Sequence, residues 1–147
     1  MKTTELNFSY KYPRMATTVD AIIVAENFHE TMILLIQRKH GPFEGIWALP
    51  GGFVDMDETL KQACNRELFE ETGLKEVELH QFYTFDAINR DPRQRTISTV
   101  FYGRIEETVE VAGGDDAKKA DWFPIISLPD MAFDHAEIIH KFIKEEL

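Results

Sequence analysis

Residues 49–74 read LPGGFVDMDETLKQACNRELFEETGL, and this stretch decides the predicted fold. Asp57 or Thr59 can cap the start of a helix that continues to Thr72. Gly73 stands directly after it, where a left-handed residue commonly ends a helix. The stretch therefore predicts a glycine turn followed by one α-helix.

The predicted helix carries carboxylates on the face that begins apolar. With Leu60 at zero and about 100° per residue, four residues fall within roughly 60° of it: Ala63, Cys64, Glu67 and Glu71. A solvated acidic face is the usual alternative, but these carboxylates continue the apolar stripe instead of opposing it. Carboxylates turned toward the protein take up protons or cost free energy unless a cation lies between them. Oxygen ligands at this density favour Mg²⁺ or Mn²⁺ over zinc.

The spacing of these residues resembles the Nudix box. Gly52 is followed after five residues by Glu58, and seven residues later by Arg66-Glu67-Leu68-Phe69-Glu70-Glu71-Thr72-Gly73-Leu74. The preceding Trp47-Ala48-Leu49-Pro50 is similar to the usual approach to the box, so the resemblance covers most of the chain. It implies an α/β (α+β) fold, a Nudix-type α/β/α sandwich with a mixed β-sheet between helices. We expect one Nudix hydrolase domain over residues 1–147.

The resemblance also implies roles for the residues of the box. Glu67, Glu70 and Glu71 would be metal ligands, together with the backbone carbonyl of Gly51, for Mg²⁺ or Mn²⁺. Arg66 would orient the carboxylates through a charged hydrogen bond, with Glu70 as its best-placed partner on the helix. Glu67 and Glu70 with Arg66 form the predicted catalytic group, in which the general base is Glu67 or an acid on a distant loop.

An acidic pair in a later glycine loop supplies the distant candidates. Asp115 and Asp116 follow Gly113-Gly114, a short distance before Trp122, where related enzymes often carry an extra acidic group. They would otherwise be ordinary turn residues. We favour Asp116 as the catalytic one. Glu58 is expected to support the loop and the helix more than to take part in the chemistry.

The rest of the chain predicts strands and one further helix. Two β-rich apolar runs separated by a short polar segment favour a hairpin. Phe8, Tyr10 and Tyr12 could stack on adenine, but their alternation also suits an edge strand with one covered face, which we favour. Helices far apart in a chain of strands suggest a mixed sheet covered on both faces. The expected strands are Thr17–Glu26, Thr31–Arg38, Val77–Ala87, Thr96–Ile105 and Ala120–Ile125, and the second helix is Asp134–Leu147.

Composition limits the class of protein. The formal net charge of −10 argues against a general nucleic-acid binder, which needs Lys and Arg contacts to phosphates. No apolar stretch is long enough to predict a membrane span. The single cysteine, Cys64, fits a reducing cytosol, and Met1 to Tyr12 lacks the apolar core of a signal peptide. We therefore expect a cytoplasmic protein.

Segments outside the box narrow the substrate. Together they are similar to the bacterial and archaeal ADP-ribose pyrophosphatase branch of the family: Tyr12-Pro13-Arg14, Leu35-Ile36-Gln37-Arg38, Asn89-Arg90-Asp91-Pro92-Arg93 and Ala132-Phe133-Asp134-His135. Arginine forks match phosphate oxygens, although any one arginine is also a common surface residue. The substrate-binding candidates are Arg38, Arg90, Arg93 and Arg95. Asp134 is expected to cap its helix, in capping-box spacing with Glu137, and His135 to be structural.

Three functions stay open. The first is hydrolysis of ADP-ribose to AMP and ribose 5-phosphate. The second is the same chemistry on a damaged nucleoside triphosphate or another dinucleotide. The third is an ADP-ribose sensor without cleavage, but such regulators usually have eroded boxes and a DNA-binding domain after the Nudix domain, whereas this chain stops at Leu147. The expected partner is a small-molecule nucleotide, not nucleic acid or a membrane, and analogy with dimeric relatives suggests a homodimer.

Overall fold

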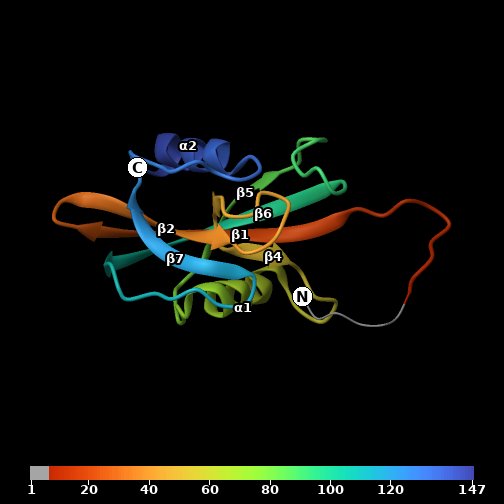
Figure 1. The fold of residues 1–147 in the computed structure, drawn as a ribbon, viewed down its shortest axis with the longest axis horizontal. Coiled ribbons are helices and arrows are strands. Elements are labelled where there is room, and N and C mark those ends of the chain that lie inside the picture. Colours follow the sequence, from red (N-terminus) through yellow and green to blue (C-terminus); the bar gives the residue numbers. More distant parts are fainter. Residues whose placement is uncertain (1–6) are drawn as a thin grey trace.

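The computed structural model describes residues 7–147, so the segment Met1 to Tyr12 discussed above lies partly outside the described residues. A mixed sheet and two helices form the described part of the chain (Figure 1). The strands are β1 (Ala16–Asn27), β2 (Glu30–Arg38), β3 (Trp47–Ala48), β4 (Gly51–Phe53), β5 (His80–Phe85), β6 (Thr96–Glu107) and β7 (Ala117–Pro124). The helices are α1 (Leu60–Thr72) and α2 (His135–Glu146).

The sheet lies between the two helices, which confirms the predicted sandwich (Figure 1). Its order is β3-β2-β1-β6-β5, with β4 paired to β1 and β7 paired to β2. The β1–β6 pair is parallel and its neighbours are antiparallel, so the sheet is mixed. One apolar cluster contains Ala63, Cys64 and Leu68 of α1, and a second contains Ile138 and Phe142 of α2. Each face of the sheet therefore has its own core.

Strand β1 changes its antiparallel partner along its length. Its first half, Thr18 to Asp20, pairs with β4, and its second half, Val24 to Asn27, pairs with β2. The central strand thus brings the glycine pair of β4 and the end of β2 to the same part of the sheet. The candidate site lies at this change of partner.

Helix α1 begins and ends at residues that the sequence predicts. Thr59 is the N-cap: its hydroxyl accepts a hydrogen bond from the Gln62 backbone N–H, and its own backbone N–H donates to the Gln62 side-chain oxygen. Thr59 is extended, so the helix begins at Leu60 and not at Asp57. Gly73 is left-handed, with φ of 78°, and its N–H donates to the Phe69 carbonyl.

The buried face of α1 is the one predicted from the periodicity. It consists of Ala63, Cys64, Glu67, Leu68, Glu71 and Thr72. The carboxylates of Glu67 and Glu71 therefore lie on the protein side of the helix, although nearly all other glutamates of the chain are exposed or partly exposed.

Two expectations about strands need correction and one is confirmed. The strand predicted over Val77–Ala87 is shorter, because its pairing with β6 runs only from His80 to Phe85, the bounds of β5. The last strand begins earlier than Ala120, at Ala117, because it pairs with β2 as far as Arg38. The hairpin between β1 and β2 is confirmed, and its turn residues Phe28 and His29 both have positive φ.

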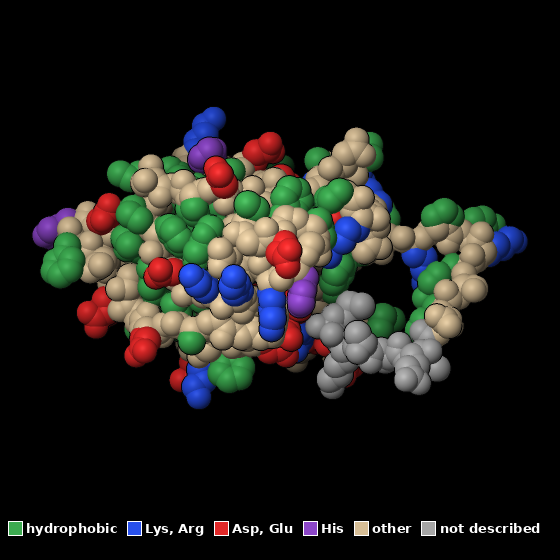
Figure 2. Space-filling view, in the orientation of Figure 1, with side chains coloured by type: hydrophobic (Ala, Val, Ile, Leu, Met, Phe, Trp, Pro, Cys, Tyr) green, Lys and Arg blue, Asp and Glu red, His purple; other side chains and the backbone are tan. Residues whose placement is uncertain are grey.

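The predicted edge strand at the N-terminus is wrong. Phe8, Tyr10 and Tyr12 lie in irregular backbone and are 67%, 52% and 70% exposed. Figure 2 shows this segment as an arm that projects from the body and carries hydrophobic side chains. Within residues 7–147, neither helix has the length and apolar character needed to cross a bilayer.

Candidate active site

A pocket of about 210 Å³ opens where β1 changes partner. Its wall joins residues from the box, from β1 and β2, and from the segments before β6 and α2. Three residues of the box and five other predicted site residues line it: Gly52, Glu67, Glu71, Gly51, Arg38, Arg90, Arg93 and Asp116. The fold therefore brings together side chains that are up to 78 positions apart, such as Arg38 and Asp116.

The glycine pair lets the backbone of β4 lie directly against the carboxylates. A Cβ atom on Gly52 would stand 2.6 Å from Oε1 of Glu67. A Cβ atom on Gly51 would stand 2.5 Å from Oδ1 of Asp20 and would collide with the Val19 carbonyl. Only glycine leaves space at these two positions, so the pair is required by close approach.

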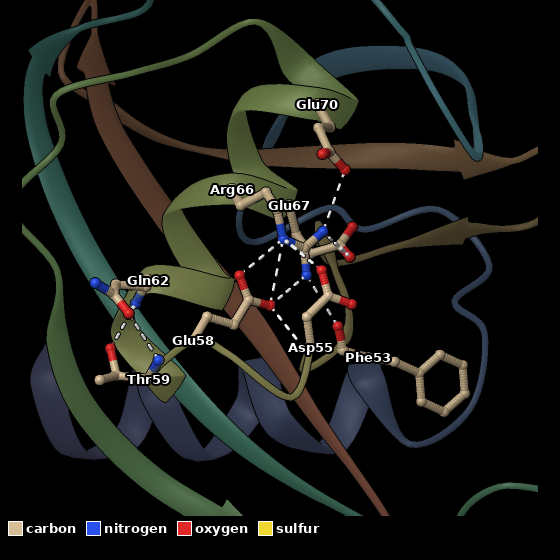
Figure 3. A network of polar contacts seen from close by, with 8 residues as sticks. All are labelled: Phe53, Asp55, Glu58, Thr59, Gln62, Arg66, Glu67 and Glu70. Carbon is tan, nitrogen blue, oxygen red and sulfur yellow. Dashed lines mark hydrogen bonds and ion pairs between the residues drawn. The ribbon is translucent and has the colours of Figure 1, made fainter. Parts of the chain in front are cut away.

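Arg66 joins the loop before α1 to the carboxylates on the helix (Figure 3). Its Nε and NH2 atoms donate to Glu58 at 2.9 and 2.6 Å, and NH2 also donates to the Phe53 carbonyl at 3.0 Å. Its NH1 atom donates to Glu67 at 2.8 Å and to Glu70 at 3.2 Å. The closest partner is therefore Glu58, whereas the sequence singled out Glu70 by its place on the helix.

This arrangement gives Glu58 the supporting role expected of it. Its Oε1 atom also accepts a hydrogen bond from the Asp55 backbone at 2.8 Å. The bonds from Arg66 lower the pKa of Glu58 and hold it ionised. The same bonds raise the pKa of Arg66. Arg66 is thus a fixed cation that orients Glu67 toward the glycine pair.

Two carboxylates of the box are buried. Glu67 and Glu71 are each 3% exposed. Burial raises the pKa of Glu67 to about 7, against the opposing hydrogen bond from Arg66. Burial also raises the pKa of Glu71 well above its ordinary value, although the Gly51 N–H donates to it at 2.8 Å. Near neutral pH Glu67 therefore holds a proton for part of the time, unless a cation replaces that proton.

The glycine loop before β7 brings a carboxylate close to Glu67 and Glu70 of α1. Single oxygen atoms of Glu67, Glu70 and Asp115 all lie within 4.8 Å of one another. The loop reaches the helix because the Ala112 N–H donates to the last residue of α1 at 3.2 Å. Gly114 packs so closely that a Cβ atom there would stand 2.5 Å from the Glu70 carbonyl.

The two aspartates of the loop therefore have different places. Asp115, with φ of 52°, faces the carboxylates of the helix, and Asp116 lines the pocket. The negative charge of Asp116 acts on both Arg38 and Glu71. The sequence singled out Asp116 and left the role of Asp115 open, because adjacent residues cannot be separated without the conformation of the loop.

Two of the predicted arginines face the pocket beside one aromatic ring. The guanidinium of Arg38 lies 4.9 Å from the ring centre of Phe133, and that of Arg93 lies 5.6 Å from it. Arg93 also pairs with Asp91 at 2.8 Å, and Arg38 donates to the Pro42 carbonyl at 2.7 Å. Burial and the charge of Arg93 lower the pKa of Arg38, so an anion between the two arginines would relieve their repulsion.

The other two predicted arginines differ from this pair. Arg90 is buried, and its Nε and NH2 atoms donate to Asp134 at 2.9 and 2.7 Å. Within the described residues, Asp134 makes no side-chain cap to α2, so the expected cap is wrong: the carboxylate binds Arg90 instead. Arg95 lies outside the pocket lining that the structure describes, and its buried NH1 atom has no partner among residues 7–147.

Three polar residues behind the glycine pair were not assigned a site role from the sequence. The Leu49 N–H donates to Nδ1 of His135 at 3.0 Å. Nε2 of His135 lies 3.6 Å from Asp20, which accepts a hydrogen bond from Ser98 at 2.5 Å. The signal for Asp20 is present in the sequence, as the single charge inside an otherwise apolar stretch of β1. His135 is buried, in agreement with the structural role expected of it.

Comparison with known proteins identifies the family. The model of the NUDIX domain matches residues 16–142. Over 135 residues the chain is 43% identical to an ADP-ribose pyrophosphatase of Methanocaldococcus jannaschii, covering 90% of this chain and 76% of that protein. It is 32% identical to the ADPR responsive transcriptional repressor NtrR of Acinetobacter baylyi, covering 88% of this chain and 54% of the repressor.

Solved structures agree with this comparison. The NUDIX domain of Shewanella oneidensis NrtR complexed with ADP ribose aligns with a TM-score of 0.87 at 27% identity, covering 96% of this chain and 95% of that one. A bifunctional NMN adenylyltransferase/ADP ribose pyrophosphatase from Francisella tularensis, complexed with AMP and a Mn ion, aligns with a TM-score of 0.80 at 33% identity. That alignment covers 92% of this chain and 43% of the bifunctional protein. The box, the fold and the family match agree, and the chain therefore belongs to the NUDIX domain family and is a Nudix hydrolase.

Proposed function

We propose that this protein hydrolyses ADP-ribose to AMP and ribose 5-phosphate, with Mg²⁺ or Mn²⁺ as its cofactor. One observation carries the proposal: a single pocket holds buried carboxylates on one wall and Arg38 and Arg93 on another. A diphosphate bound between these walls needs positive charge on both sides, which arginines supply directly and carboxylates supply through a metal ion. The identity of 43% to an ADP-ribose pyrophosphatase supports the choice of substrate.

Carboxylates at the pocket and next to it fit a divalent metal ion, and Glu67 belongs to both groups. Glu67, Glu70 and Asp115 offer oxygen atoms within 4.8 Å of one another, and oxygen is the ligand that Mg²⁺ and Mn²⁺ prefer. Gly52 leaves space for the Glu67 carboxylate where any other residue would fill it. On the pocket side, Glu67 is joined by Glu71, which accepts a hydrogen bond from the Gly51 N–H at 2.8 Å. A bound divalent ion would supply charge neutralisation on the phosphoryl oxygens and would acidify water.

The protein's own residues orient the reactants. Arg66 holds the Glu67 carboxylate by a hydrogen bond of 2.8 Å, and we assign Glu67 as the general base. In the reaction the water oxygen bonds to phosphorus, the bridging P–O bond breaks, and the proton of the water passes to the carboxylate. The buried Glu67 carboxylate lines the pocket, where it can accept a proton from a bound water molecule. Asp116 lines the pocket and is the second candidate for the base.

The arginine wall binds the diphosphate. Arg38 and Arg93 both lie next to Phe133, and each is within cation–π distance of its ring. The ring and the Asp91 carboxylate limit how far these guanidinium groups can move. Phosphate oxygens between them would replace repulsion between the two cations by charged hydrogen bonds.

A substrate panel tests the proposal. The purified protein is assayed with Mg²⁺ and with Mn²⁺ against ADP-ribose, 8-oxo-dGTP, dGTP, NADH and diadenosine polyphosphates, with detection of released AMP or phosphate. We expect the highest kcat/KM for ADP-ribose. If a nucleoside triphosphate exceeds ADP-ribose by about tenfold or more in kcat/KM, a margin that a single pocket contact can produce, the proposed substrate is wrong.

A sensor that binds ADP-ribose without cleaving it is the second candidate. The similarity to the transcriptional repressor favours it, at 32% identity. The complete carboxylate group favours hydrolysis, because it is needed for chemistry and not for binding of the sugar nucleotide. Calorimetric binding of ADP-ribose, with no AMP released in the presence of either metal, would identify a sensor.

A further inference from the structure

The chain segment that leads into α2 contacts three different walls of the pocket. The Phe133 ring lies beside Arg38 and Arg93, at 4.9 and 5.6 Å from their guanidinium groups. Asp134 binds Arg90, and His135 binds the backbone of Leu49. Phe133 thus reaches the two arginines, Asp134 reaches the turn before β6, and His135 reaches the segment before the glycine pair.

The backbone of this segment is strained at its first residue. Phe133 has φ of 52°, in the left-handed region that bulky residues rarely adopt. Such a conformation is strained, and strain of this kind is concentrated at functional sites. The strain at Phe133 therefore marks the segment that also carries Asp134 and His135.

His135 acts on the segment that carries Gly51. Its Nδ1 atom accepts the Leu49 N–H at 3.0 Å, so the neutral ring carries its proton on Nε2, toward Asp20 at 3.6 Å. Burial lowers the pKa of His135 and keeps the ring neutral. Ser98 holds the other oxygen of Asp20 at 2.5 Å.

This bond fixes the position of the backbone two residues before Gly51. Gly51 in turn donates to Glu71 at 2.8 Å. Without an acceptor at the position of Nδ1, the buried Leu49 N–H would lose its partner, and the glycine segment would have to move to find another.

Asp134 acts on the turn that carries Arg93. Both partners of the Asp134–Arg90 pair are largely buried, with side chains 13% and 4% exposed. The pair is bidentate, so it fixes the orientation of Arg90 as well as its distance. Arg93 lies in the same turn, three positions after Arg90, and has its own contact with Asp91.

We infer that Asp134 and His135 are positioning residues that set the two walls of the pocket separately: His135 positions the glycine segment against the metal-binding carboxylates, and Asp134 positions the arginine turn that binds the diphosphate. This inference rests on the proposed metal-dependent hydrolysis. It predicts that loss of the His135 side chain weakens metal binding and that loss of the Asp134 side chain weakens substrate binding. A general loss of stability would instead weaken both kinds of binding in each variant.

The variants are His135→Leu, His135→Asn and Asp134→Ala, with His140→Leu as the matched control on the exposed side of α2. Loss of an outer-shell partner typically weakens metal binding by about 10–100-fold. We expect His135→Leu to weaken Mn²⁺ binding by about tenfold or more, with a smaller change in KM. The Asn side chain offers an oxygen near the position of Nδ1, so His135→Asn should bind Mn²⁺ within about threefold of wild type.

Asp134→Ala should show the opposite pattern. We expect its Mn²⁺ affinity to match wild type and its KM for ADP-ribose to rise by about tenfold, as expected when uniform binding is lost. The control should match wild type in both quantities. Mn²⁺ binding is measured without substrate by electron paramagnetic resonance of the free ion, KM at saturating Mn²⁺, and ADP-ribose affinity by calorimetry.

The results separate this inference from the proposed function. If ADP-ribose is bound but not cleaved, the Mn²⁺ and calorimetric measurements still test the positioning roles. Equal Mn²⁺ affinity in wild type and His135→Leu would overturn the role of His135. If His135→Leu does not fold, a Mn²⁺ affinity of His135→Asn more than tenfold below wild type would overturn it. Parallel losses of metal and ligand binding in both Asp134→Ala and His135→Leu would show general destabilisation and overturn the inference.

Discussion

Replacement of Glu67 by glutamine should make the metal-free protein more stable, and only above a defined pH. Glutamine keeps the length of the side chain and an oxygen that can accept the bond from Arg66. In the folded protein burial raises the pKa of Glu67 from an ordinary value of 4.5 to about 7. A raised pKa in the folded state means that the carboxyl group keeps its proton in the folded protein after the unfolded chain has lost it.

The sign and the size of the effect follow from this difference. Below pH 4.5 both states hold the proton, and Glu67 does not affect the free energy of unfolding. Between pH 4.5 and about 7 the free energy of unfolding falls as the pH rises. Above that range the loss is complete and amounts to about 3 kcal/mol, at about 1.4 kcal/mol for each pH unit. This value already includes the opposing bond from Arg66.

The assay is thermal unfolding of wild type and Glu67→Gln, followed by circular dichroism in the presence of a chelator at pH 4.5, 6 and 8. For a chain of this length about 1 kcal/mol corresponds to about 2–4 °C. We therefore expect the variant to melt about 6–12 °C above wild type at pH 8 and at the same temperature at pH 4.5. Saturating Mn²⁺ should raise the melting temperature of wild type more than that of the variant.

Comparison of the two proteins at each pH isolates Glu67, because the other titrating groups are common to both. His135, for example, has a lowered pKa and removes stability from both proteins as the pH falls. Equal melting temperatures at pH 8 would refute the argument that burial of Glu67 destabilises the metal-free protein. An advantage of the variant that is as large at pH 4.5 as at pH 8 would assign the effect to packing and not to charge.

Three further variants test the rest of the site. Glu71→Gln should weaken Mn²⁺ binding and reduce turnover by at least about 10²-fold, a size typical of the loss of a catalytic electrostatic group; full activity at limiting metal would contradict its assignment as a ligand. Arg93→Ala should raise KM for ADP-ribose by a factor that is about tenfold larger than the factor by which it lowers kcat. Arg104→Ala, on an exposed part of β6, should change neither KM nor kcat. Asp115→Asn should weaken Mn²⁺ binding by about tenfold, and unchanged binding would remove Asp115 from the metal site.

The sequence predicts the box helix well because its determinants are local. The capping residue Thr59, the left-handed Gly73 and the periodic buried face all lie within one continuous segment, and the structure confirms each of them. The sandwich is also predictable, because two helices separated by strands must cover opposite faces of the sheet. Periodicity identifies which side of a helix is buried, and here it placed Glu67 and Glu71 on that side.

The partners of charged side chains were harder to predict because they depend on distant segments. Asp134 and Glu137 have the spacing of a capping box, but Asp134 binds Arg90, which precedes it by 44 positions. Arg66 has Glu70 one turn along its helix, yet its closest partner, Glu58, lies before the helix begins. Local spacing shows which bond a side chain can make, and tertiary contacts decide which bond it makes.

The features that lower the stability of the folded protein are concentrated around the pocket. The contacts that stabilise the fold lie elsewhere. The pocket wall contains two buried carboxylates with raised pKa values and a left-handed phenylalanine, Phe133. The two apolar clusters on either side of the sheet are closely packed, with fully buried residues such as Ile22, Leu34 and Phe142. A sequence selected for stability alone would replace Glu67 and Glu71 by apolar residues, because they already lie on the apolar stripe of α1. The presence of Glu67 and Glu71 where the central strand changes partner is best explained by a ligand that the protein must bind there. A divalent cation is such a ligand, because its binding would remove the repulsion between the buried carboxylates.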